Sequence, residues 1–113
     1  MHEIDRDILR EQMGDEADVD ALLRELAPIF VDYSRACFEK LHAAATVGDL
    51  ETVASLAHTL KGSAATLGAT SLAECCAELQ WAARSQNEED ATRSIERVTS
   101  SFDHVARELS DYL

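Results

Sequence analysis

The sequence predicts an all-α fold, namely an antiparallel up-down-up-down four-helix bundle with a short extra helix at its N-terminus. Apolar residues recur every three or four positions along most of the 113-residue chain, which is the period of an amphipathic helix. Short polar breaks separate these stretches, and the alternation typical of strands is absent. Because short connections between substantial helices favour antiparallel neighbours, we expect a bundle.

The first two predicted helices differ in length. Apolar residues at helical spacing predict a short helix over about residues 5–13, which Gly14 stops. An acidic turn over residues 15–20 then leads into a long second helix. Pro28 should kink or interrupt this helix near residues 24–27, and one bent helix or two shorter pieces both remain open. The apolar stripe of the second helix is Leu22, Leu23, Leu26, Ile29, Phe30, Tyr33, Cys37 and Leu41.

The last two helices follow a break at Gly68. Thr70 or Ser71 should cap the fourth helix, and Ser71-x-x-Glu74 has the pattern of a capping box. The fifth helix should span residues 88–112, with Asn87 as its N-cap. The predicted core positions of the two helices are Leu72, Cys75, Cys76, Leu79, Ala83, Ile95, Val98, Phe102, Val105, Ala106 and Leu109.

Length and charge limit the functions that are possible. Residues 1–113 are enough for a single domain with one core. A net charge of -12 argues against binding to nucleic acid or to an anionic membrane surface. No apolar run is long enough to span a membrane, and the first residues lack the pattern of a signal peptide, so we expect a cytoplasmic location. Cys37, Cys75 and Cys76 show no metal-binding or redox spacing, and we interpret them as small core residues with no metal site.

The third helix, predicted over residues 50–67 between the N-cap Asp49 and the C-terminal cap Gly68, carries the main candidate site. Its apolar stripe consists of Val53, Ala57, Leu60, Ala64 and Leu67. His58 and Gly62 fall about 140° and 180° from Val53 around the helix, so both face solvent. A glycine in the middle of a helix costs about 1 kcal/mol relative to alanine. Because residue i+4 lies beside residue i, we interpret Gly62 as an opening that leaves the His58 ring accessible.

The charge around His58 suits a group that carries an anion. The chain has 22 acidic residues, yet none lies between Thr52 and Ala73, and one of its two lysines is Lys61. A neutral imidazole nitrogen is a good nucleophile near pH 7, and a nearby ammonium group could offset the charge of a phosphoryl group on it. The remaining histidines lack this setting and are interpreted as surface residues, namely His2, His42 and His104.

A family resemblance rests on these residues. The stretch His58-x-Leu60-Lys61-Gly62-Ser63-Ala64-x-x-Leu67-Gly68 resembles the signature of histidine-containing phosphotransfer (HPt) domains of bacterial and fungal phosphorelays. The resemblance extends over nearly the whole chain in length and helix order. It implies that His58 accepts a phosphoryl group from a receiver-domain aspartyl phosphate and passes it to another receiver-domain aspartate.

The resemblance also implies roles for the fourth helix and for the partners. Gln80 would hold one ring nitrogen of His58, and Arg84 would be a second cation beside Lys61. The domain would be a monomeric phosphocarrier without an ATP site or cofactor of its own, and Mg²⁺ would be needed only in the receiver partner. Because such domains occur both free and fused, the chain could also be part of a larger hybrid histidine kinase.

Three alternatives remain. The histidine domain of a chemotaxis-type kinase has a similar core, but typically adds a histidine and a glutamate on the next helix, where this chain has Ala77 and Gln80. The dimerising histidine domain of a sensor kinase typically has an acidic or asparagine residue after the histidine and a proline further on, which are absent here. A pure interaction module would dock on a regulator or enzyme without phosphotransfer. Trp81 lies opposite its helix's core stripe, either on a contact surface or against a neighbouring segment.

Overall fold

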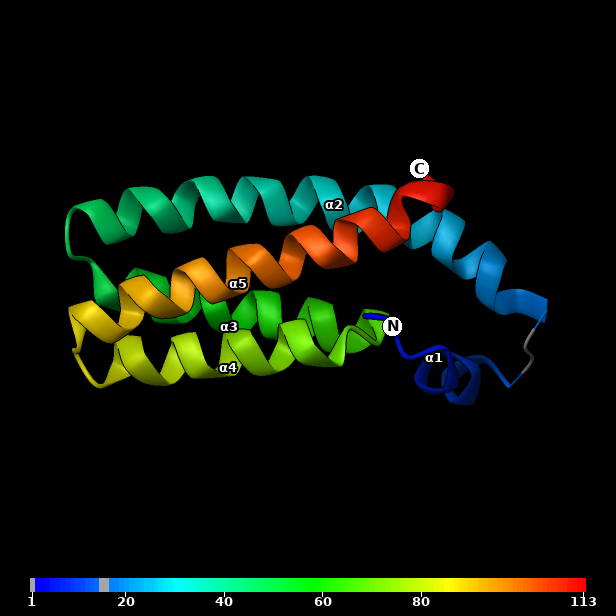
Figure 1. Cartoon of the computed structure of the whole chain (residues 1–113), viewed down its shortest axis with the longest axis horizontal. Coiled ribbons are helices and arrows are strands. Elements are labelled where there is room, and N and C mark those ends of the chain that lie inside the picture. The colour runs from blue at the N-terminus through cyan, green and yellow to red at the C-terminus, as the bar shows by residue number, and fades with distance from the viewer. Residues whose placement is uncertain (1, 15–16) are drawn as a thin grey trace.

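Four long helices form the body of the molecule. The computed structural model describes residues 2–14 and 17–113. The elements in chain order are α1 (Arg6–Met13), α2 (Ala17–Thr46), α3 (Leu50–Leu67), α4 (Thr70–Arg84), α5 (Glu88–Leu109) and a 3₁₀ turn, η1 (Ser110–Tyr112). Figure 1 shows α2 to α5 running lengthwise in alternating directions, with α1 beyond one end of α3 and α4. The predicted all-α, up-down-up-down bundle with a short extra N-terminal helix is therefore confirmed. No helix among the described residues is both long and apolar enough to span a membrane.

The caps of α3 agree with the sequence, whereas the predicted cap of α4 is wrong. Asp49 accepts a hydrogen bond from the backbone N–H of Thr52 at 3.1 Å, and Gly68 ends α3 in the left-handed conformation with φ 81°. Ala69, rather than Thr70 or Ser71, is the N-cap of α4 and makes no side-chain cap hydrogen bond. The backbone N–H of Ala69 donates to the Ala64 carbonyl at 2.9 Å. This tight turn starts α4 early, so Ser71 lies inside its first turn and Glu74 lies beyond it.

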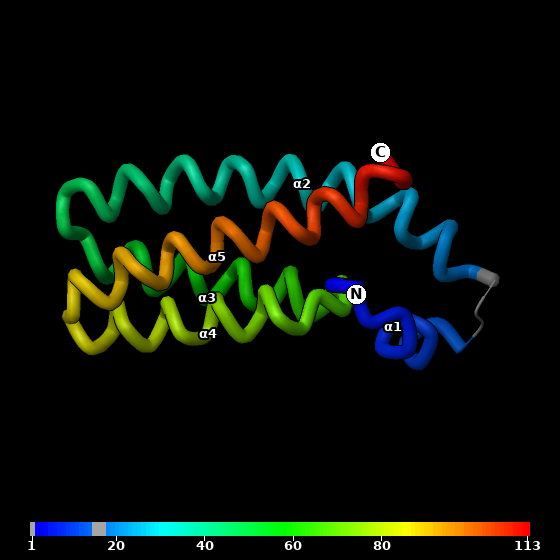
Figure 2. Tube along the Cα trace, in the orientation of Figure 1, coloured from blue at the N-terminus to red at the C-terminus, as the bar shows by residue number. Residues whose placement is uncertain are grey.

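Pro28 lies inside one continuous helix. The structure resolves the open question, because α2 runs unbroken from Ala17 to Thr46. Its axis changes direction in the N-terminal part of the helix (Figure 2), as expected where proline removes a backbone hydrogen bond. The acidic turn is shorter than predicted, since Asp18 and Asp20 already belong to the first turn of α2. Residues 15–16 of that turn lie outside the described residues.

The bundle core contains most, but not all, of the predicted apolar positions. The whole α3 stripe is buried, as are Leu72, Cys76, Leu79 and Ala83 on α4. Two residues assigned to the α2 core are not in it: Ile29 is 66% exposed and Tyr33 is 42% exposed. Both line an open groove between α2 and α3, which is described with the functional site.

Hydrogen bonds hold the N-terminal segment against one end of the bundle. The backbone N–H groups of Glu3 and Ile4 donate to the Glu108 carboxylate on α5, at 2.6 and 3.0 Å. The N–H of Asp5 donates to the Gly68 carbonyl at 2.8 Å. These bonds hold α1 near the C-terminal end of α3, away from the middle of that helix, where His58 lies. The predicted fifth helix is α-helical only to Leu109 and ends in the 3₁₀ turn.

Candidate functional site

His58 lies on the outer side of α3, near the middle of the helix. It is exposed, whereas its neighbour Ala57 is completely buried. This contrast follows from the helical period, since consecutive residues differ by about 100° around the axis. The ring is therefore anchored by a well-packed helix while its outer edge remains accessible to a partner.

Gln80 on α4 holds one edge of the His58 ring. Its side-chain Nε2 lies 3.2 Å from Nδ1 of His58, within hydrogen-bond distance. Gln80 itself is only 7% exposed, so its amide is held in place by the packing between α3 and α4. The other ring nitrogen, Nε2, has no hydrogen-bond partner among the described residues. The structure thus brings these two predicted site residues together, and the contact distinguishes the two ring nitrogens.

Two basic side chains lie near the ring and are not engaged by carboxylates. Lys61 is one turn after His58 on α3 and partly exposed, and Arg84 is one turn after Gln80 on α4 and exposed. Within the part of the chain that the structure describes, neither forms an ion pair. Both cations are therefore available to an anion.

Gly62 leaves open space beside the imidazole. A Cβ atom built at this position would meet no heavy atom within 4 Å. Close helix packing therefore does not explain this mid-helix glycine. By contrast, a Cβ at Gly68 would lie 2.8 Å from the Asp5 carbonyl oxygen, so that glycine has a structural reason.

A polar hollow borders His58 on the α4 side. It has a volume of about 490 Å³. Its lining residues are Leu50, Glu51, Ala54, Ser55, His58, Thr59, Ala83, Arg84 and Gln86. Sequence reasoning included His58 and Arg84 but missed the rest. Glu51 is two turns before His58 on the same helix, and the i, i+7 spacing could have placed it on this face.

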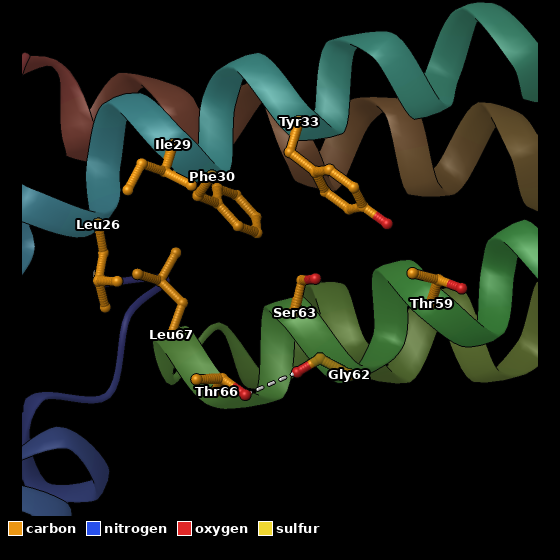
Figure 3. A pocket seen from close by; sticks show the side chains of 9 residues that line it. All are labelled: Leu26, Ile29, Phe30, Tyr33, Thr59, Gly62, Ser63, Thr66 and Leu67. Atoms are coloured by element: carbon orange, nitrogen blue, oxygen red, sulfur yellow. Dashed lines mark hydrogen bonds between the residues drawn. The ribbon is translucent and has the colours of Figure 1, made fainter.

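An apolar groove borders the site on the α2 side. It has a volume of about 550 Å³. Its lining residues are Leu26, Ile29, Phe30, Tyr33, Thr59, Gly62, Ser63, Thr66 and Leu67. Figure 3 shows Ile29, Phe30 and Tyr33 on α2 facing α3 across this groove. Since Gly62 belongs to the groove and is the i+4 neighbour of His58, the groove opens directly beside the ring.

The cysteines make no disulfide, and none of them lines the hollow or the groove. Cys37 and Cys76 are buried, and Cys75 is half-buried rather than a full core residue. Burial raises the pKa of the Cys76 thiol to about 12 and also raises the pKa of Cys75. Thiols with a raised pKa are poor nucleophiles near neutral pH. In residues 2–14 and 17–113, no group of three or more histidine, cysteine and acidic side chains could hold a metal ion.

The exposed surface also contains Trp81. Its side chain is 75% exposed, so of the two interpretations left open by the sequence, packing against a neighbouring segment is excluded. His2, His42 and His104 are exposed. His2 and His104 each lie beside a glutamate, at 3.1 Å from Glu108 and 3.7 Å from Glu3.

Comparison with protein families identifies the class to which this fold and site belong. A family model described as Hpt domain matches residues 25–109, which is more than half of the chain. The chain therefore belongs to the Hpt domain family, as the resemblance around His58 implied. Domains of this class serve histidine phosphotransfer in phosphorelays and interact with receiver domains of response regulators. Comparison with curated proteins found no match, and neither did comparison with solved structures.

Proposed function

We propose that this domain carries a phosphoryl group on His58, taking it from the aspartyl phosphate of one receiver domain and passing it to the aspartate of another. The observation that carries the proposal is the His58 ring itself. One nitrogen of this exposed side chain is held by a buried amide, and the other has no partner among the described residues, with open space at Gly62 one turn away. We expect residues 1–113 to act in this step as one phosphotransfer unit.

The transfer is an in-line displacement at phosphorus. The lone pair of His58 Nε2 attacks the phosphorus atom, and the N–P bond forms as the bond from phosphorus to the aspartyl oxygen breaks. The aspartate leaves as a carboxylate with the bonding electron pair, while the proton on Nδ1 stays on the ring. The product is a phosphoryl dianion on an imidazolium. Positioning and charge stabilisation supply most of the catalysis in such transfers.

Gln80 controls which ring nitrogen is reactive. In the orientation observed, its amide nitrogen faces Nδ1, and an amide N–H group can only donate. With the amide turned this way, Nδ1 would accept and the ring proton would be on Nε2, a tautomer whose Nε2 cannot attack phosphorus. Rotation of the amide by about 180° would place its carbonyl oxygen opposite Nδ1, move the ring proton there and free the Nε2 lone pair. Gln80 therefore serves both tautomers without moving its backbone.

Lys61 and Arg84 stabilise the phosphorylated form more than the fold. A single exposed charge contributes about 0–1 kcal/mol to stability, whereas a charge-assisted hydrogen bond to a phosphoryl oxygen is worth about 1.5–3 kcal/mol. Lys61→Ala should therefore leave the melting temperature nearly unchanged and slow transfer about tenfold. Arg84→Ala should act in the same direction but more weakly, since it lies one turn beyond Gln80. Melting temperature and transfer kinetics of both variants check this prediction. A large loss of stability with unchanged transfer would mean that these cations are structural.

The apolar groove is the docking surface for the receiver domain. Exposed apolar side chains cost free energy in water, and a contiguous group of them beside a reactive residue marks a protein contact surface. Ile29 contributes much of this exposed surface, on the same side of the molecule as Gly62. A partner covering the groove would place its own loops over His58.

Ile29→Ser should weaken receiver docking without weakening the fold. Because the Ile29 side chain is 66% exposed, its loss should change unfolding free energy by no more than about 0.5 kcal/mol. Transfer at low receiver concentration should fall about three- to tenfold, from lost apolar contact. Val47→Ser is the matched control, since Val47 is 77% exposed but lies outside the groove. Equal slowing by both variants, or by neither, would contradict the assignment of the groove.

The function is tested by direct phosphoryl transfer. Receiver domains phosphorylated with a small acyl phosphate donor are incubated with this chain, and radiolabel on the chain is followed with time. The label should survive alkali and be lost in acid, which is the behaviour of phosphohistidine, whereas an aspartyl phosphate is lost in both. A second, unlabelled receiver should then remove the label from the chain. Failure of every receiver in a broad panel to label the chain would leave a docking module as the better explanation.

A further inference from the structure

Gln86 stands out among the residues with positive φ. In the described part of the chain four residues have positive φ, and three of them are glycines: Gly14, Gly48 and Gly68. The fourth is Gln86, with φ 59°. An L-residue other than glycine is disfavoured in this left-handed region because its Cβ atom approaches the backbone. This chain therefore uses glycine at every described left-handed position except the one after α4.

The turn itself does not require a glutamine side chain. The backbone N–H of Gln86 donates to the Ala83 carbonyl at 3.1 Å, and the next N–H, of Asn87, donates to Ala82 at 3.2 Å. These are the backbone bonds of a helix C-terminus that commonly has glycine at this position. Among the residues that the structure describes, the Gln86 side chain makes no hydrogen bond. The amide therefore does not stabilise the turn, and a glycine could make the same backbone hydrogen bonds.

The Gln86 side chain instead lines the polar hollow that contains His58 and Arg84. Gln86 is exposed and lies two residues beyond Arg84, the last residue of α4. It is therefore positioned to contact a protein that covers the hollow.

The chemistry of the hollow indicates what would be contacted. Unlike the apolar groove on the other side of His58, the hollow presents the Glu51 carboxylate, the Ser55 hydroxyl and the Arg84 guanidinium. A primary amide both donates and accepts, so it matches exposed peptide groups. Binding and catalytic residues of proteins lie disproportionately on surface loops, which expose such groups.

We propose that Gln86 is a specificity-determining contact that hydrogen-bonds the loop backbone beside the receiver's aspartate while His58 reacts. This inference rests on the proposed function and deepens it. The apolar groove and the polar hollow then lie on opposite sides of His58, and their different chemistry fixes the orientation in which a receiver docks.

Two variants distinguish the contribution of the Gln86 side chain from that of its backbone conformation. Gln86→Gly removes the amide and relieves the strain of the left-handed backbone conformation. Gln86→Ala also removes the amide but keeps that strain. Transfer from the receiver that labels the wild-type chain fastest should fall about three- to tenfold in both variants, as expected for one lost hydrogen bond. The melting temperature should rise only for Gln86→Gly. Chemical phosphorylation of His58 by phosphoramidate, a donor too small to reach Gln86, should be unchanged in both.

The outcomes distinguish this inference from the proposed function. Wild-type rates of receiver transfer in both variants would overturn the role of Gln86 and leave the phosphocarrier function intact. Slowing by Gln86→Gly alone would also overturn it, because the cause would then be backbone flexibility. Equal slowing of the phosphoramidate reaction would overturn it by showing an effect on His58 itself. If the wild-type chain accepts no phosphoryl group from any receiver, the proposed function fails, and this inference with it.

Discussion

His58→Gln is expected to reduce receiver-dependent labelling of this chain to background. Glutamine has a polar side chain of similar length but no nucleophilic nitrogen, so the attack on phosphorus is lost. The fold should be unaffected, because the side chain is exposed and glutamine favours a helix at least as well as histidine. The measurement is radiolabel on the chain after incubation with phosphorylated receiver, together with the melting temperature.

His42→Gln is the matched control for this experiment. His42 is an exposed histidine on a helix, like His58, but it lies on α2 and lines neither the hollow nor the groove. It should retain wild-type labelling. Wild-type labelling of the His58→Gln variant would move the phosphorylation site to His2, His42 or His104, and the arrangement around Gln80 would need another explanation.

The third helix could be predicted in full because every signal there is local. Its caps at Asp49 and Gly68 and its buried stripe depend only on sequence spacing, and the observed helix has the predicted bounds. The contact between His58 and Gln80 is different, because 22 residues separate them. Spacing alone placed both residues on suitable faces, but only the family resemblance brought the two faces together.

The errors in the prediction came from tertiary packing. Ile29 and Tyr33 fit an apolar stripe, but periodicity does not tell whether a helix face packs against a neighbour or lines an open groove. The capping box at Ser71 was displaced because a backbone bond from Ala69 closes the turn two residues before it. The polar hollow was missed for a similar reason. Its sequence signals are the i, i+7 spacing of Glu51 and His58, and Gln86 at a turn position where this chain elsewhere has glycine.

Gly62→Leu is expected to stabilise the fold and to slow transfer more than tenfold. A leucine removes the cost of a mid-helix glycine, about 1 kcal/mol, which should raise the melting temperature by several degrees.

Long side chains on a helix lean toward its N-terminus, over the i-4 and i-3 residues, so this leucine would cover His58 and enter the mouth of the apolar groove. Gly62→Ala is the matched control. Its methyl group would meet nothing within 4 Å, so it should give the same gain in stability with nearly wild-type transfer. In the leucine variant the melting temperature should rise while transfer slows. These opposite directions distinguish an effect on access to His58 from an effect on folding. Fast transfer by Gly62→Leu would show that open space above the imidazole is not required, and the reason for a glycine at this position would have to be sought elsewhere.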